Sequence, residues 1–343
     1  MKSKLLLLIS FLLVLSFWNW IALGFQALAY PRSESGAASN VVAQGPYAYA
    51  SLGGEGLAIV ELASGRKVET LAPPRGSGSV DDLAVADGWL FVLDAEIPGH
   101  LSVYSLADPA QPRLVEQPRE IDVGPFSGVS AAAGKVIVSG GTSRLSLLRY
   151  DAQGRLGSEI VFADLGRGQP DILLRPDGVV AVVSSHFVGP RFGLTTLKLD
   201  SMPLGLQVQA KLEIEGAGFS AGGATPANFP IEGAWAGETL LLAYGRGLGI
   251  FEVDSQGALR LRRRLELGLA AVNVDAQGRF AAVVGASPEP SLLILDLGSP
   301  QDPKVLRRIA LPRETRATGV ALAGDKVVVA AQNQGVLTFN THP

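Results

Sequence analysis

A short turn recurs along the sequence at nearly constant intervals, and this repeat restricts the fold more than any other feature. The seven turns are Gln44-Gly45, Asp87-Gly88, Gly134-Lys135, Asp177-Gly178, Gly237-Glu238, Gln277-Gly278 and Gly324-Asp325. Successive turns lie 40 to 47 residues apart, except for one interval of 60 residues. A hydrophobic run follows each turn, and a second run follows after a further loop. This period is typical of the four-stranded blade of a β-propeller.

Residues 79–115 show one complete repeat. They contain four short apolar runs, separated by Asp87-Gly88, Pro98-Gly99 and a proline-containing turn at 108–112. The apolar residues alternate with period two or run continuously, and helical periodicity is absent. A sheet of this kind has two faces to bury, so it needs neighbours of the same shape. The sequence therefore predicts an all-β fold, a seven-bladed β-propeller of four-stranded antiparallel blades over residues 41–343.

The first 29 residues have a different character. Lys2 and Lys4 precede an apolar run over residues 5–25, and Ala27-Leu28-Ala29 has the small-x-small pattern of a signal peptidase site. Residues 1–29 are predicted to be a signal peptide; the alternative is an uncleaved membrane anchor, because the run is long enough to span a bilayer. Either segment directs the chain from Tyr30 onward out of the cytoplasm, to the periplasm, the exterior or an outward-facing anchored position.

Composition excludes several classes of function. The net charge of −3 gives no electrostatic basis for binding nucleic acid. The chain has no cysteine, so the fold must be stable without disulfides, and thiolate chemistry is excluded. It has three histidines, none in a recognisable catalytic triad pattern. The only basic run, residues 262–264, is interpreted as a solvated sheet edge.

The turns at residues 107–115 and 298–306, the second of which follows the strand-like run 293–297, resemble the LVIVD-type repeats of exported bacterial and archaeal propellers. They are also similar to the YVTN-type repeats of surface proteins and of lactonase-like propellers. The resemblance covers about residues 40–339. Its motifs define strands and turns and carry no chemistry. The more distant likeness to lactonase-like propellers implies carboxylates and an asparagine at a central metal.

The ends of the repeat array do not match. The last copy stops at Phe339-Asn340 without an outer strand, and residues 30–40 form a linker. We hypothesise that this linker supplies a closing strand, with part of residues 34–42 pairing with the last blade. The alternative is an open-edged last blade capped by the C-terminal tail.

In a propeller, the loops leading into the innermost strands and the loops joining second to third strands share one face, around the channel mouth. Loops on a rigid scaffold commonly carry function. Within the 60-residue interval, glycine-rich loops at 184–192 and 216–230 hold isolated phenylalanines suited to a ligand or partner contact; the alternative is an insertion whose phenylalanines pack onto the blade. The candidate ligand- or partner-binding residues on this face are Asp82, Asp171, His186, Arg191, Phe219, Phe229, Glu232, Arg246, Asn273 and Arg316.

Two functions remain. The favoured one is a non-catalytic exported propeller that binds an envelope or extracellular protein, or a small ligand, through this face; it needs no cofactor. The alternative is a lactonase-like, metal-assisted hydrolase holding a divalent cation such as calcium by oxygen ligands on Asp82, Asp171, Glu232 and Asn273. The strand phase places Asp82 and Glu232 at equivalent steps and Asp171 one residue earlier. A structural envelope component held by an uncleaved leader is a third possibility, and only that leader would contact a membrane.

Overall fold

A computed structural model describes most of the chain after the leader. The described residues are 38–73, 78–94, 98–121, 128–140, 144–162, 169–185, 191–201, 204–215, 232–285, 289–332 and 334–342. The predicted leader, 1–29, therefore lies outside them. Within these ranges no helix is long and apolar enough to cross a membrane.

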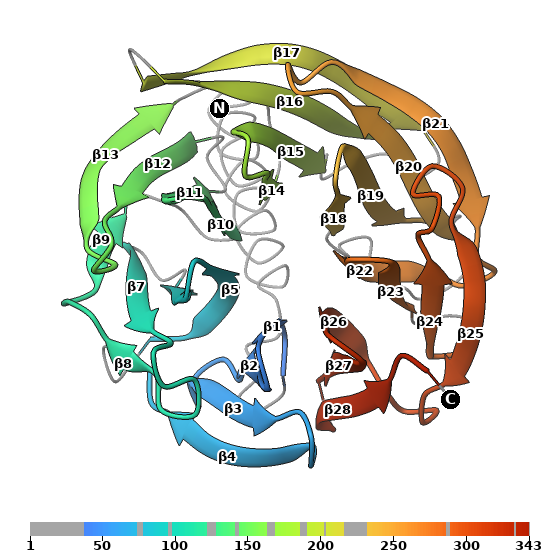
Figure 1. Cartoon of the computed structure of the whole chain (residues 1–343), viewed down its shortest axis with the longest axis horizontal. Coiled ribbons are helices and arrows are strands. Elements are labelled where there is room, and N and C mark those ends of the chain that lie inside the picture. The colour runs from blue at the N-terminus through green and yellow to red at the C-terminus, as the bar shows by residue number, and fades with distance from the viewer. Residues whose placement is uncertain are drawn as a thin grey trace, which may run out of the picture.

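The described chain forms seven antiparallel sheets arranged in a ring, a seven-bladed β-propeller (Figure 1). The innermost strands of blades 1 to 7 are β1 (Val41–Gln44), β5 (Val80–Ala86), β10 (Gly128–Ala132), β14 (Gln169–Leu174), β18 (Gly233–Ala236), β22 (Ala271–Gln277) and β26 (Ala317–Ala323). The second strands are β2 (Tyr47–Ser51), β6 (Trp89–Asp94), β11 (Lys135–Gly140), β15 (Val179–Ser185), β19 (Thr239–Tyr244), β23 (Phe280–Gly285) and β27 (Lys326–Ala331).

The third strands are β3 (Leu57–Glu61), β7 (Gly99–Ser105), β12 (Arg144–Tyr150), β16 (Arg191–Ser201), β20 (Gly247–Val253), β24 (Ser291–Asp296) and β28 (Gly335–Asn340). The outer strands of blades 1 to 6 are β4 (Arg66–Leu71), the pair β8 (Arg113–Leu114) and β9 (Arg119–Ile121), β13 (Leu156–Phe162), β17 (Leu204–Glu215), β21 (Leu259–Glu266) and β25 (Lys304–Ala310). The predicted fold is confirmed, with one departure at the last blade.

The repeated turn joins the first and second strands of every blade. Its glycine adopts a positive φ in all seven copies, the conformation that glycine accepts without steric cost; these residues are Gly45, Gly88, Gly134, Gly178, Gly237, Gly278 and Gly324. In blade 2, Ala86 pairs with Trp89 across the turn, and both Asp87 and Gly88 have positive φ. This is the hairpin geometry whose twist matches that of the strands it joins.

Apolar side chains between neighbouring blades form the core. The Phe91 ring of blade 2 lies 5.0 Å from the Tyr150 ring of blade 3, and the Phe192 ring of blade 4 lies 5.1 Å from the Tyr244 ring of blade 5. Each fully buried side chain of this size stabilises the fold by about 1.5–3 kcal/mol. Stacking of blades therefore replaces the disulfides that a chain without cysteine cannot form.

The predicted strand closure is wrong for the part that the structure describes. Residues 38–42 belong to blade 1: Ser51 N donates to Asn40 O at 2.9 Å, and Val41 pairs with Ala50. Residues 34–37 lie outside the described residues. Blade 7 has three described strands, and its C-terminal tail is held by Thr341 N, which donates to Asp325 O at 2.8 Å. In the described residues blade 7 has no fourth strand, and the alternative of an open-edged blade capped by the tail stays a prediction.

Part of the 60-residue interval between turns is occupied by the long outer strands of blade 4. β16 and β17 are 11 and 12 residues long, so the blade ends in an extended outer hairpin. The loops at 186–190 and 216–231 lie outside the described residues. The basic run at 262–264 lies on the outer strand β21 and is mostly exposed, as predicted.

Arg175 ties blade 4 to blade 5 and provides a test of inter-blade bonding. Its guanidinium donates to Val253 O at 2.7 Å and to Asp254 O at 2.6 Å, and it lies 4.9 Å from the centre of the Trp235 ring. Only 6% of its side chain is exposed.

We expect Arg175→Ala to lower the free energy of unfolding by about 2–3 kcal/mol, because a buried carbonyl and a partly buried one lose charged donors. Urea unfolding measures this, with the exposed Arg155→Ala as the matched control. A loss no larger than that of the control would contradict the assigned role.

Candidate acidic site at the channel mouth

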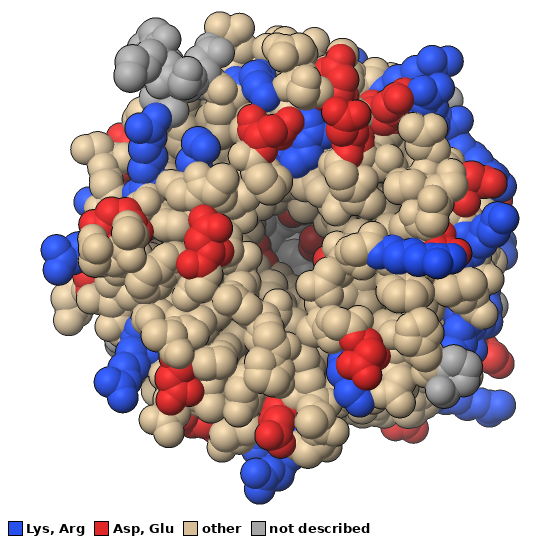
Figure 2. All heavy atoms as spheres, viewed as in Figure 1, with Lys and Arg blue, Asp and Glu red and all other residues tan. Residues whose placement is uncertain are grey.

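One position recurs at the start of all seven innermost strands and lines the channel at one level. It lies four residues before the last residue that bonds across the first hairpin, which in blade 4 is Arg175, just after β14, and its partner on the second strand is likewise equivalent in every blade. From blade 1 to blade 7 this ring of residues, called the mouth ring here, is Asn40, Asp82, Gly128, Asp171, Glu232, Asn273 and Gly319. Figure 2 shows the ring hollowed at its centre, with acidic side chains inside the opening.

Asp171 belongs to the same level as Asp82 and Glu232, so the predicted phase difference is wrong. The first hairpin of blade 4 is longer, and Arg175 N donates to Val179 O at 2.8 Å before the turn begins. A count back from the turn glycine therefore places Asp171 one residue out of step with Asp82 and Glu232. A count back from Arg175, the last residue that bonds across the hairpin, places all three at the same level. In blades 2 and 6 a register shift just before Asp82 and Asn273 keeps the same position facing the channel.

Asp82 accepts hydrogen bonds from three donors in three blades. Its Oδ2 accepts from Val129 N of blade 3 at 2.7 Å, and its Oδ1 accepts from its neighbour Leu83 N at 2.9 Å. Oδ1 also accepts from Asn40 Nδ2 of blade 1. The channel edge of an innermost strand has backbone N–H groups without a ladder partner, and Asp82 satisfies one of them. This carboxylate is therefore part of the scaffold as well as of the mouth ring.

Asp171 and Glu232 form a carboxyl pair next to it. Asp171 Oδ1 accepts from Ile172 N at 2.7 Å, and its buried Oδ2 accepts from no N–H group of the described residues. The Glu232 carboxyl lies within hydrogen-bonding reach of Asp171, and that bond requires one of the two to be protonated. Glu232 is the donor because no backbone N–H of the described residues stabilises its charged form.

The three carboxyl groups have raised pKa values. Burial raises the pKa of Asp82 to about 6, against the opposing effect of its three donors. Burial, followed by the negative charge of Asp82, raises the pKa of Asp171 to about 8. Burial and the charges of both aspartates raise the pKa of Glu232 well above its usual range. Near neutral pH the Asp171–Glu232 pair therefore holds at least one proton.

Glycine gives these groups room. Gly128 stands between Asp82 and Asp171 in the mouth ring, and a Cβ at this position would lie 3.6 Å from Asp82 Oδ2. Because blade 3 contributes no side chain there, the charges of Asp82 and Asp171 act on each other across it.

The other described candidates do not join the carboxyl cluster. Asn273 is 8% exposed, and its Nδ2 donates to Thr318 O of blade 7 at 3.5 Å. Arg246 is exposed in the hairpin between β19 and β20, and Arg316 is exposed just before β26. Gly245 and Arg246 form the turn of this hairpin, in which Tyr244 pairs with Gly247.

Four candidates cannot be placed as side chains. His186, Phe219 and Phe229 lie outside the described residues, and for Arg191 only the strand backbone is described. Three mouth-ring residues, Asn40, Gly128 and Gly319, were not among the candidates. Their equal spacing from the last paired residue before the repeated turn was the signal that would have found them.

The donor set does not form a ready metal site. Among the described residues, no group of three or more His, Asp or Glu side chains has the geometry to hold a metal ion. Both oxygens of Asp82 already accept backbone N–H donors, which leaves Asp171 Oδ2 and the Glu232 carboxyl. Two carboxyl groups that share a proton can accept N–H donors from a cation once that proton leaves.

The fold is similar to that of solved propeller structures, whereas the sequence is not similar to known families. The structure of U3-55K matches with a TM-score of 0.61 at 12% identity, covering 88% of this chain and 90% of that one. The streptogramin B lyase structure matches with a TM-score of 0.59 at 13% identity, covering 91% and 94%. The computationally designed Ika8 protein matches with a TM-score of 0.54 at 10% identity, covering 88% and 83%.

No protein-family model matches the sequence, and no curated protein matches it significantly. At these identities the structural matches show the propeller fold alone. The resemblance to LVIVD- and YVTN-type repeats stays a prediction.

The raised pKa values predict that the cluster destabilises the fold as pH rises. A carboxyl group with a raised folded pKa binds more protons in the folded than in the unfolded state at intermediate pH. The stability it contributes is therefore present at pH 4 and is lost up to the folded pKa, about 6 for Asp82 and about 8 for Asp171. The neutral variant Asp171→Asn should be more stable than the wild type at pH 8 by at least about 1 kcal/mol, and the difference should shrink toward pH 5.

Calorimetric or urea unfolding between pH 5 and pH 8.5 measures this difference. The exposed turn variant Glu238→Gln removes one carboxylate away from the cluster and should show no such pH trend. A pH-independent difference for Asp171→Asn would contradict the assigned protonation.

Proposed function

We propose that this protein is a binding protein whose channel mouth takes a cationic N–H donor, an ammonium or guanidinium group of a protein or small ligand. The observation that carries the proposal is the convergence of Asp82, Asp171 and Glu232 from three blades on one level of the channel. Burying a carboxyl group costs free energy unless its oxygens are hydrogen-bonded, and Asp171 Oδ2 has no N–H donor from the described residues. A ligand that supplies the donor would remove that cost.

The charge of the site favours a cation with directional N–H groups. The described carboxyl oxygens accept from backbone and side-chain N–H groups already, and a guanidinium or ammonium extends the same pattern. Asp82 is largely ionised at neutral pH, whereas the Asp171–Glu232 pair releases its proton when the cationic ligand binds. Binding is therefore coupled to proton release.

The wider setting of this function rests on the sequence. The leader at 1–29 supports a location outside the cytoplasm, and the resemblance to LVIVD- and YVTN-type repeats supports an exported propeller. The proposed ligand is accordingly one found in the envelope or outside the cell, and the loops of the channel-mouth face would supply its remaining contacts.

We expect arginine amide and methylguanidinium to bind with an affinity that rises from pH 6 to pH 8.5, as protons leave the carboxyl pair. Isothermal titration at several pH values, in buffers of different ionisation enthalpy, measures both the affinity and the proton release. Asp171→Asn should weaken binding at least about tenfold, because losing one member of a desolvated charge pair costs about 2–5 kcal/mol.

Asp325→Asn is the matched control, because it removes the same charge from an exposed turn residue away from the cluster. It should leave the affinity nearly unchanged. If neither cation binds at pH 8.5, or if both aspartate variants weaken binding equally, the proposal is wrong.

A second candidate is metal-assisted lactone hydrolysis. The observation that favours it is the presence, in one site, of carboxyl groups in different protonation states: Glu232 held as an acid beside ionised Asp82. Such a pair divides the roles of proton donor and charge stabiliser. A divalent cation would supply Lewis-acid activation, and the carboxylates of Asp82 and Asp171 would have to hold it while Glu232 keeps its proton. The described donor geometry supports this less well than it supports an N–H donor.

The two functions differ in what a chelator does. If the protein is a hydrolase, metal analysis of the purified protein should find a divalent ion, and a lactone panel should show turnover that a chelator abolishes. Glu232→Gln should then lower turnover without preventing metal uptake by the remaining aspartates. Absence of turnover with calcium, magnesium and manganese supplied would exclude the hydrolase.

A further inference from the structure

Blade 7 has an open outer edge in the described residues. β28 pairs with β27 alone, whereas every other third strand also pairs with an outer strand. The burial of β28 differs accordingly. Residues 335–339 are all half-buried, while the corresponding strand β20 is buried along nearly its whole length. The last blade therefore exposes a strand with the sequence of an interior one.

The register identifies which backbone groups face outward. Thr341 N donates to Asp325 O, and bonded and non-bonded pairs alternate along an antiparallel ladder, so the N–H and C=O groups of Thr338 and Val336 point away from β27. The equivalent of Thr338 in blade 2 is Val103, whose O accepts from Val115 N on the outer side at 2.9 Å. Thr338 thus presents the groups that an outer strand would use.

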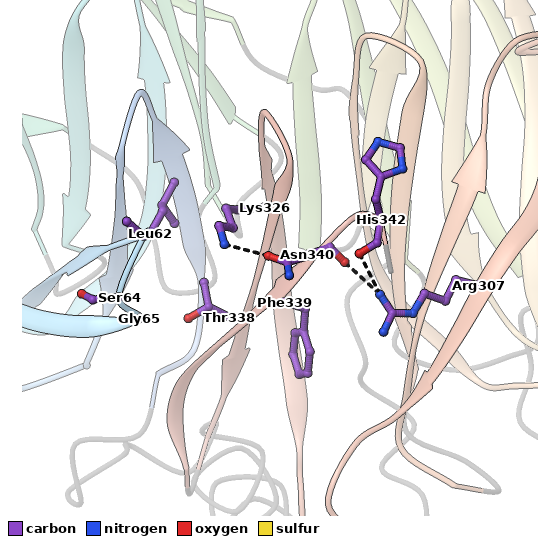
Figure 3. A pocket seen from close by; sticks show the side chains of 10 residues that line it. Leu62, Ser64, Gly65, Arg307, Lys326, Thr338, Phe339, Asn340 and His342 are labelled. Carbon is purple, nitrogen blue, oxygen red and sulfur yellow. Dashed lines mark hydrogen bonds between the residues drawn. The ribbon is translucent and has the colours of Figure 1, made fainter.

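A polar pocket of about 370 Å³ lies at the end of this edge. It lies between the β3–β4 turn of blade 1, β28 and the outer strand β25 of blade 6 (Figure 3). Gly65 of that turn has a φ of +66°, and a Cβ there would lie 2.7 Å from Thr338 Oγ1, so only glycine permits this approach. The lining includes Gly65, Arg307, Lys326, Thr338, Asn340 and His342.

The pocket carries positive charge. Arg307 Nη1 donates to Asn340 O at 3.3 Å and to His342 O at 3.2 Å, and Lys326 Nζ donates to Asn340 Oδ1 at 2.7 Å. Figure 3 shows both cations directed toward Asn340 from opposite sides. No Asp or Glu is among the described lining residues. Both cations have more N–H groups than these bonds use, so they can also donate hydrogen bonds to an anionic oxygen.

We propose that an extended segment of a partner protein adds to β28 as the fourth strand of blade 7 and places a carboxylate between Arg307 and Lys326. Main-chain bonds to Thr338 and Val336 supply affinity, and the carboxylate supplies specificity. An antiparallel partner begins beside Asn340, so its acidic residue stands at its N-terminal end. Charge complementarity of the pocket selects an acidic strand over a neutral one. This surface lies on the outer rim and is independent of the carboxyl cluster at the channel mouth.

The probe is a fluorescein-labelled acetyl-Glu-Thr-Val-Thr-Val-Thr amide, and fluorescence anisotropy with the full chain measures its affinity. We expect saturable binding that weakens about fivefold when the peptide Glu is replaced by Gln, equivalent to a partly exposed ion pair of about 1 kcal/mol. Methylation of alternate backbone nitrogens of the peptide should abolish binding, because it removes the ladder donors. Both peptide changes leave the protein intact, so they test the proposal whether or not a variant folds.

Arg307→Gln should weaken the Glu peptide about fivefold and leave the Gln peptide unaffected. Lys304→Gln is the matched control, since it removes a positive charge from the same strand outside the pocket lining. Failure of the probe to bind, or binding that ignores backbone methylation, would overturn strand addition. Equal affinity for the Glu and Gln peptides would overturn the carboxylate role.

Two other occupants of the β28 edge would give different results in these experiments. If a peptide copying residues 28–37 of this chain displaces the probe at a lower concentration than the unlabelled probe does, the edge belongs to the chain's own upstream segment and the partner proposal is wrong. If sedimentation shows a dimer that Arg307→Gln dissociates, the occupant is a second copy and the proposal is likewise wrong. A monomer that prefers the Glu peptide supports it.

Discussion

The central constraint on this structure is the unpaired channel edge of its innermost strands. Each blade pairs its first strand on one side only, so the backbone N–H groups facing the channel need other acceptors. The chain meets this need with side chains of the preceding blade: Asp82 Oδ2 accepts from Val129 N, and Asp275 Oδ2 accepts from Leu322 N, each at 2.7 Å. The fold therefore requires polar or acidic side chains that face the channel.

This constraint links scaffold and candidate site. Asp82 and Asp275 both have raised pKa values because of burial, yet backbone donors from two residues hold each of them in place. Asp171 and Glu232 differ from this pattern, because their carboxyl groups face each other and have fewer donors. The mouth-ring position thus serves two purposes: at Asp82 a backbone donor from the next blade is within reach and the carboxylate binds the blades together, whereas at Asp171 and Glu232 the carboxyl groups remain for a ligand.

Ring closure depends on side chains in the described part of the chain. Blade 1 begins with its own innermost strand, and small residues such as Ala48, Ala50 and Ala330 pack between blades 1 and 7. Thr318 Oγ1 of blade 7 donates to Ala38 O at 3.2 Å and bonds the two ends across the seam. The consequence is a last blade whose third strand has an open edge next to a positively charged pocket. The two unusual surfaces of the molecule, one acidic and central, one basic and peripheral, both occur where strand pairing ends.

The number of blades and the seven hairpins could be predicted from the amino-acid sequence alone, because turn glycines and period-two apolar runs are local signals with local causes. The sequence also identified Asp82, Asp171 and Glu232, since acidic residues at the start of an apolar strand are conspicuous. Only the tertiary structure decided that these three share one level, because the longer hairpin at Arg175 altered the count from the turn. Tertiary structure likewise assigned residues 38–42 to blade 1 and Asn273 to a bond with blade 7, since pairing across blades depends on contacts that no local pattern encodes.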